Sequence, residues 1–107
     1  MQETEFSATG VRIERWARSL TRAGQVIVKD GRLALLTSNG REIDSAPVVA
    51  VSAGRPWFAG AGAAVARLNG TRYRLTMGQR DHDPDPDRTG PARRFLETLR
   101  SAGGRTT

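Results

Sequence analysis

Two dipeptides that tolerate positive φ angles, Asp30-Gly31 and Asn69-Gly70, each stand between short runs of alternating apolar and polar residues. Such pairs favour the type I′ turn of a two-residue β-hairpin, whose twist matches that of the flanking strands. The turn also fixes which residues face each other across the hairpin. The sequence therefore predicts a β-rich fold with at least two tight hairpins.

The hairpin around Asp30-Gly31 has a defined register. It sets Val28 opposite Leu33 on one face and Lys29 opposite Arg32 on the other. The first face is apolar and is expected to be the core face. The second face begins with two like charges side by side.

The loop that follows allows two registers. A two-residue Asn39-Gly40 turn would set Leu35 opposite Asp44 and place a carboxylate on the core face. A three-residue loop, Ser38–Gly40 with its glycine in the left-handed region, sets Leu35 opposite Ile43 instead. We expect the second register, followed by a strand over residues 48–52.

The hairpin around Asn69-Gly70 places positive charges together. Its register sets Arg67 directly opposite Arg72, with Arg74 two residues further along the same face. Like charges across a strand pair are destabilising by roughly 0.2 to 1 kcal/mol. Carboxylates of the same chain, namely Glu42, Asp44 or the acidic segment 80–90, could neutralise them, and so could an anionic partner.

Helical periodicity occurs near both ends of the chain. Val11–Arg22 has apolar residues at amphipathic spacing, which predicts a short N-terminal helix ending at Gly24; a short strand at Val11–Ile13 is the competing interpretation. A second helix is predicted over residues 91–102. Its apolar stripe consists of Ala92, Phe95, Leu96, Leu99 and Ala102.

The length allows one domain. We expect a flexible N-terminus at 1–10, a single domain at 11–103 and a flexible tail at 104–107. Within the domain, residues 80–90 are rich in Asp and Pro and should form an exposed loop, while residues 91–102 close the fold.

About seven short strands in meander order, followed by one amphipathic helix, resemble the pleckstrin homology (PH)-like superfold. The resemblance covers about 24–103 and rests on Gly24–Val28, Arg32–Thr37, Gly40–Ile43, Asn69–Leu75 and Phe95–Leu99. It implies a mainly β fold: a partly open antiparallel barrel or sandwich capped by the C-terminal helix. Members of this superfold are typically non-catalytic and bind phosphoinositides, peptides or other proteins.

The chain departs from the pattern of that superfold at two points. Members that bind phosphoinositide usually carry a Lys followed by basic-x-Arg across the first hairpin. Here Lys29 and Arg32 flank the turn, but Ala34 stands where the second basic residue should be. The closing helix has Phe95 where a Trp is common. These departures, with the arginine-rich composition, are typical of a distant bacterial member of actinobacterial type.

The formal net charge is +6, and all but one of the 17 basic residues are arginine. A GC-rich genome would by itself favour Arg over Lys, whereas clustered positive charge also attracts anionic partners. The candidate ligand-binding residues are Lys29, Arg32, Arg67, Arg72 and Arg74.

The inventory of reactive side chains argues against an enzyme. The chain has no cysteine and a single histidine, His82, inside the acidic stretch Asp81–Asp87. An EF-hand loop requires Gly at its sixth position and Glu at its twelfth. In a loop that starts at Asp83, those positions hold Arg88 and Arg94. We expect no metal site and no cofactor.

Three binding functions remain. The first is a protein-interaction or adaptor module, self-association included, with a groove beside the closing helix and with Trp57 and Phe58 as candidate aromatic anchors. The second is peripheral binding to anionic lipid headgroups through the basic hairpin face. The third is nucleic-acid binding, ranked lower because no aromatic residues alternate with the arginines. A cytoplasmic protein, in the second case at the inner membrane face, is expected because the absence of cysteine fits a reducing compartment and the longest apolar run is too short to span a membrane.

Overall fold

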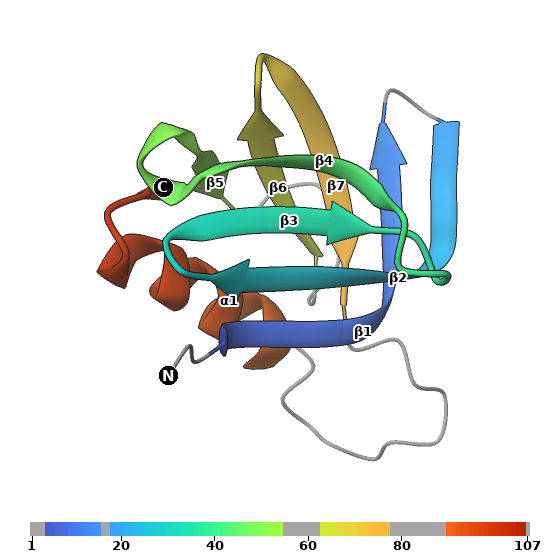
Figure 1. Cartoon of the computed structure of the whole chain (residues 1–107), viewed down its shortest axis with the longest axis horizontal. Helices are drawn as coiled ribbons and strands as arrows, with labels where there is room; N and C mark the ends of the chain where they lie inside the picture. The colour runs from blue at the N-terminus through green and yellow to red at the C-terminus, as the bar shows by residue number, and fades with distance from the viewer. Residues whose placement is uncertain (1–3, 16–17, 55–62, 78–89, 107) are drawn as a thin grey trace.

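Eight strands form one curled sheet in the part of the chain that the computed structural model describes, residues 4–15, 18–54, 63–77 and 90–106 (Figure 1). The strands are β1 (Thr4–Arg15), β2 (Arg18–Lys29), β3 (Arg32–Leu36), β4 (Glu42–Pro47), β5 (Ser52–Gly54), β6 (Ala63–Leu68), β7 (Thr71–Thr76) and β8 (Arg105–Thr106). Their order is β4-β3-β2-β1-β7-β6-β5-β8. With one C-terminal helix, α1 (Gly90–Ser101), this confirms the expected mainly β, partly open fold capped by a helix.

Strand β1 joins the two halves of the sheet. It pairs with β2 over nearly its whole length, whereas its pairing with β7 covers only Arg12–Glu14. Between its pairs with β2 at Ala8 and Val11, β1 has one residue more than β2, and Gly10 adopts a φ of 65° there. This bulge increases the local twist and turns β1 from one half of the sheet into the other.

Gly24 lies directly opposite Val11 at this bend and is buried. A Cβ atom at this position would lie 2.5 Å from the carbonyl oxygen of Leu36 and 2.5 Å from Cγ2 of Thr21. The carbonyl belongs to the backbone of β3 and cannot rotate away. Only glycine lets β2 and β3 approach this closely.

Both Asx-Gly turns have the predicted conformation. Asp30 and Gly31 have φ angles of 53° and 74°, and Asn69 and Gly70 have 52° and 80°. The pairs that the turns predict are confirmed in both hairpins: Val26–Leu35, Val28–Leu33, Lys29–Arg32, Ala64–Leu75, Ala66–Tyr73 and Arg67–Arg72.

The loop between β3 and β4 was predicted correctly, but the register beyond it was not. Thr37 and Arg41 close a three-residue loop, and Gly40 has a φ of 82°. A bulge then follows, so that Leu35 lies opposite Asp44 rather than Ile43. The expected register was wrong because the Asp44 carboxylate finds hydrogen-bond donors at the edge of the core, as described below.

Helix α1 packs against β1, β5, β6 and β8 and places its apolar stripe on the core. The rings of Phe95 and Phe6 lie with their centroids 5.5 Å apart. The core draws on every strand except β8, and its largest fully buried side chains are Phe95, Ile13, Leu33, Leu35, Leu68, Leu75, Leu99, Val11, Val26, Val28, Val48 and Val51.

The predicted N-terminal helix at Val11–Arg22 is wrong. Val11 and Ile13 are fully buried while Arg12 and Glu14 lie on the opposite face, which is the two-residue period of a strand. The competing strand interpretation was correct. Local helical spacing was outweighed by pairing with β7, a partner more than fifty positions away in the sequence.

The expected chain ends and one expected strand also need correction. Residues 4–10 belong to β1, and Phe6 is part of the core, so the domain begins before Val11. Arg105 and Thr106 form β8, parallel to β5, instead of a flexible tail. The strand predicted at 48–52 is a 3-10 helix, η1 (Val48–Ala50), followed by the short β5. Residues 80–89 lie outside the described residues.

We expect Gly24→Ala to lower the free energy of unfolding by about 1 to 3 kcal/mol, because the added methyl group must displace the Leu36 carbonyl. Chemical denaturation monitored by circular dichroism measures the change. Ser19→Ala, at an exposed position of the same strand, is the control and should change stability by less than about 0.5 kcal/mol. Equal stability of the two variants would show that the backbone adjusts freely at this bend.

Phe95→Ala should cost about 3 to 5 kcal/mol, because it removes a fully buried ring and its contact with Phe6. Loss of cooperative unfolding on heating would be the most severe form of this result. Glu97→Ala, an exposed position of the same helix, is the matched control. A cooperative Phe95→Ala variant of unchanged midpoint would show that α1 is not needed to complete the core.

Candidate binding surface

The β6–β7 hairpin carries three arginines on its outer face. Arg67 and Arg72 are direct cross-strand partners, and Arg74 lies opposite Val65 two register positions further along the same face. All three side chains are exposed, while Ala66 and Tyr73 between them are buried. The structure thus brings together three of the five predicted ligand-binding residues.

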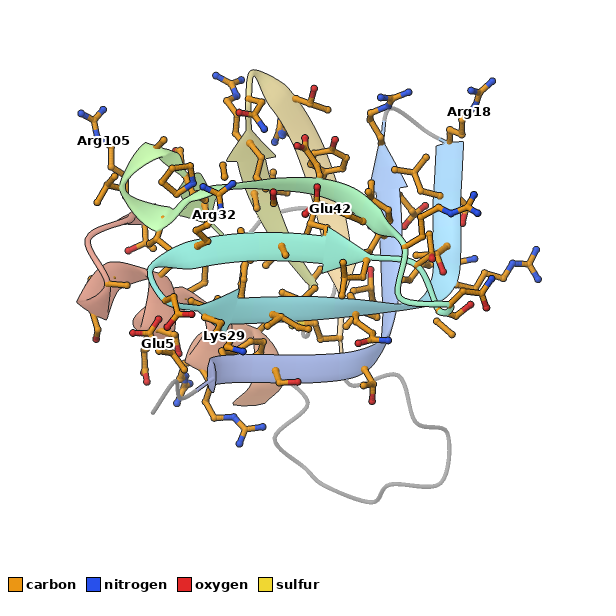
Figure 2. The ribbon with its side chains drawn as sticks, viewed as in Figure 1. Glu5, Arg18, Lys29, Arg32, Glu42 and Arg105 are labelled. Atoms are coloured by element: carbon orange, nitrogen blue, oxygen red, sulfur yellow. The ribbon has the colours of Figure 1, made fainter. Side chains whose placement is uncertain are left out.

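A second pair of opposed arginines lies at the end of the neighbouring hairpin. Arg15 of β1 is the direct partner of Arg18 of β2, and both are exposed. Because Glu14 of β1 lies opposite Arg74 of β7, the two hairpins are adjacent in the sheet. The ends of these two hairpins point to the same side of the molecule (Figure 1), and Figure 2 shows Arg18 there, at the start of β2.

Arg15 and Arg18 were not predicted to oppose each other, because residues 11–22 were expected to be helical. The alternation of buried Val11 and Ile13 with Arg12 and Glu14 was the signal that could have found them. The first hairpin of the fold is consequently β1–β2, not β2–β3. On this hairpin too no basic residue stands two positions after the first arginine of the second strand, since Leu20 follows Arg18-Ser19.

The other two predicted residues do not join this cluster directly. Lys29 pairs with Thr4 at the opposite end of β1 and lies beside Glu5 (Figure 2). Arg32 is opposite Lys29, as predicted, and its Nη2 donates to Oγ of Ser45 at 3.3 Å across the outer face of β3 and β4. The five predicted residues therefore do not form one compact site.

The tip of the β6–β7 hairpin is fixed to β4 by one carboxylate. The hydroxyl of Tyr73 donates to Oδ2 of Asp44 at 2.7 Å, and Nδ2 of Asn69 donates to Oδ1 of Asp44 at 2.7 Å. Nδ2 of Asn69 also donates to the carbonyl of Ser45 at 2.9 Å. We call this set of contacts the Asp44 clasp. The Ser45 N–H donates to Oδ1 of Asp44 as well, so this carboxylate already accepts from three neutral donors inside the fold.

The clasp affects the acidity of Tyr73. Burial raises the pKa of its hydroxyl, and the hydrogen bond to the Asp44 carboxylate and the negative charge of that group raise it further. The positive charge of Arg15 acts in the opposite direction. The positive charge of Arg15, at the end of the β1–β2 hairpin, therefore lies close enough to the clasp to affect the pKa of Tyr73 in the β6–β7 hairpin.

Several candidates lie outside the described residues. These are the aromatic anchors Trp57 and Phe58, His82 and the acidic stretch Asp81–Asp87. In the described part of the chain, no three His, Cys, Asp or Glu side chains gather as metal ligands would. No helix there has the length and apolar character needed to cross a membrane.

The arrangement of strands and helix was compared with known structures. It is similar to the solution structure of the pleckstrin homology domain of mouse ethanol decreased 4 protein, with a TM-score of 0.64 and 8% sequence identity over 94% of this chain and 88% of that one. The chain has a PH-like fold. The sequence itself matches no family model and no curated protein. The PH-like resemblance is thus confirmed for architecture, at an identity that shows the fold alone.

We expect the single tyrosine, Tyr73, to ionise above its ordinary pKa of 10.0 in the folded domain. Above about pH 10 the unfolded chain releases a proton that the folded chain retains, so the free energy of unfolding should fall as the pH rises further. Tyrosinate absorbance in native and denatured protein measures both titrations.

Asp44→Asn should move the Tyr73 titration back toward its ordinary value, because the neighbouring negative charge is removed. Glu42→Gln, an exposed carboxylate of the same strand, serves as the control and should leave it in place. Identical titrations in wild type and Asp44→Asn would mean that burial alone determines the acidity of Tyr73.

Proposed function

We propose that this PH-like domain is a non-catalytic binding module whose partner is a protein with a negatively charged surface. The partner binds the arginine-bearing ends of the β1–β2 and β6–β7 hairpins. The module needs no cofactor, and its affinity decreases with rising salt because the contacts are exposed ion pairs.

The observation that carries the proposal is the opposition of like charges in two adjacent hairpins. Arg15 faces Arg18, and Arg67 faces Arg72, each pair at the end of its hairpin. A like-charge pair opposes hairpin stability. Among the described carboxylates, Asp44 is engaged in its clasp and cannot offset Arg67 and Arg72 as a dedicated partner. An anionic partner supplies the compensation that the described fold does not.

A peripheral membrane function is the second candidate. The observation in its favour is that the hairpin ends that carry both arginine pairs point to one side of the molecule, where a lipid surface could meet them together (Figure 1). The incomplete phosphoinositide pattern on both the first and the second hairpin favours a protein instead. Lys29, at the other end of β1, adds nothing to such a surface.

Replacing Arg67 and Arg72 together with Gln should leave the free energy of unfolding unchanged or raise it by up to about 1 kcal/mol, because a repulsive pair is removed. The same change should abolish recovery of specific proteins in affinity isolation from native lysate at low salt. Mass spectrometry identifies the proteins lost relative to wild type.

The matched control is Arg93→Gln with Arg94→Gln, which removes the same charge from an exposed face of α1. It should retain the partners. Flotation with phosphatidylserine vesicles separates the two candidates, since vesicle binding lost only in the hairpin variant would assign the face to membranes. Equal recovery of proteins by all three forms would contradict the proposal.

A further inference from the structure

A row of four polar side chains, three of them arginines, crosses the C-terminal half of the sheet at right angles to the strands. Arg72 of β7 pairs with Arg67 of β6, Arg67 pairs with Ser52 of β5, and Ser52 pairs with Arg105 of β8. Paired residues lie side by side on the same face of a sheet. Four strands therefore contribute one residue each to a continuous line, which we call the arginine row.

The arginine row faces away from the core and from α1. The residues one position along, Ala66 and Ala53, are buried, and Thr106 accepts a hydrogen bond from Nε of Arg100 in α1. Since successive side chains of a strand point to opposite faces, Arg105 points outward. Figure 2 shows Arg105 projecting from the end of the chain on the side opposite α1.

All four side chains of the row are exposed. No hydrogen bond or ion pair joins the guanidinium groups of Arg67, Arg72 or Arg105 to another described residue. The next register row on the same face consists of Arg74, Val65 and Gly54, of which the last two are half-buried. On that side of the row, between Arg74 and β8, the described residues add no further positive charge.

We propose that the arginine row binds an extended acidic segment of the protein partner, with carboxylates at alternate positions. This inference rests on the proposed function and adds the partner's chemistry and two further residues, Ser52 and Arg105. Each guanidinium presents two parallel N–H donors to a carboxylate, and the Ser52 hydroxyl offers one more donor between Arg67 and Arg105.

The dimensions of the row and of such a segment agree. Three strand spacings separate Arg72 from Arg105, which is about 14 Å. Three carboxylates at alternate positions of an extended peptide span about 13 Å, because each residue advances the chain by about 3.3 Å. An extended chain lying across the strands can therefore reach all three arginines at once.

Other anionic partners fit this face less well. A membrane surface is satisfied by charges spread over a plane, whereas this row is a single line. Single-stranded nucleic acid binds where bases can stack on aromatic side chains. In the described part of the chain, Val49 is the one large hydrophobic side chain that is exposed, so no aromatic platform adjoins the row.

Fluorescence anisotropy with a labelled peptide of four Glu-Ser repeats tests the inference on the full chain at low salt. Arg105→Gln alone should weaken binding about two- to fivefold, and the triple change of Arg67, Arg72 and Arg105 to Gln should remove measurable binding. The Arg93→Gln and Arg94→Gln control should bind like wild type. All these positions are exposed, so unchanged melting temperatures will show that the fold is intact.

Equal affinity of wild type and Arg105→Gln for the peptide would overturn the inference. So would equal weakening by the α1 control, which would indicate attraction by net charge alone. If Arg105→Gln weakened binding to phosphatidylserine vesicles or to a single-stranded oligonucleotide more than binding to the peptide, the row would be assigned to lipid or to nucleic acid instead. If the peptide does not bind while protein recovery still requires Arg67 and Arg72, this inference fails and the proposed function stands. If neither readout depends on them, both fail.

Discussion

The close approach of β2 to β3 at Gly24 is the constraint on which the rest of the fold depends. With no Cβ to meet the Leu36 carbonyl, β2 bends inward, and β1 follows through its bulge at Gly10. The bend lets one end of β1 pair only with β2 and lets Arg12–Glu14 pair with β7 as well. The two hairpins with opposed arginines become neighbours only because β1 makes this change of direction. A local steric requirement at one buried glycine thus determines where the charged ends of the molecule meet.

The Asp44 clasp joins β4 to the β6–β7 hairpin, which the bend in β1 and β2 has brought near it. The Val48 N–H donates to the Gly31 carbonyl, and hydrogen-bonded pairs alternate along antiparallel strands, so the backbone groups of Ser45 point away from β3. The Ser45 N–H donates to the Asp44 side chain, and the Ser45 carbonyl accepts a hydrogen bond from Asn69. The backbone of Pro47 also points away from β3, but proline has no N–H to offer another strand. The clasp therefore holds the two halves of the sheet together and occupies a strand edge that could otherwise pair with another chain. Partners are left with the charged faces rather than with this edge.

Local signals in the sequence predicted what is local in the structure. Two Asx-Gly turns sufficed for the register of two hairpins, and through it for the placement of Arg67, Arg72 and Arg74 on one face. Features that depend on distant partners could not be predicted. Val11–Ile13 forms a strand because β7 lies beside it, Asp44 is tolerated at the core edge because Tyr73 and Asn69 reach it, and Arg105 joins the row because β8 pairs with β5. The alternation of Val11 and Ile13 with Arg12 and Glu14 was a local sign of the strand, but nothing near Asp44 or Arg105 in the sequence indicates its partner.

Charge and core are kept apart in a way that separates binding from stability. No charged side chain is buried among the described residues, and the opposed arginine pairs are exposed at the ends of their hairpins. Repulsion between like charges there is screened, so each pair costs little. The same two residues placed mid-strand and half-buried would oppose folding strongly, because a lower dielectric magnifies the repulsion. Hairpin ends are therefore the positions at which this fold can carry exposed like charges for a partner to bind. The β1–β2 and β6–β7 hairpins, which are joined by the pairing of β1 with β7, both carry opposed arginines there.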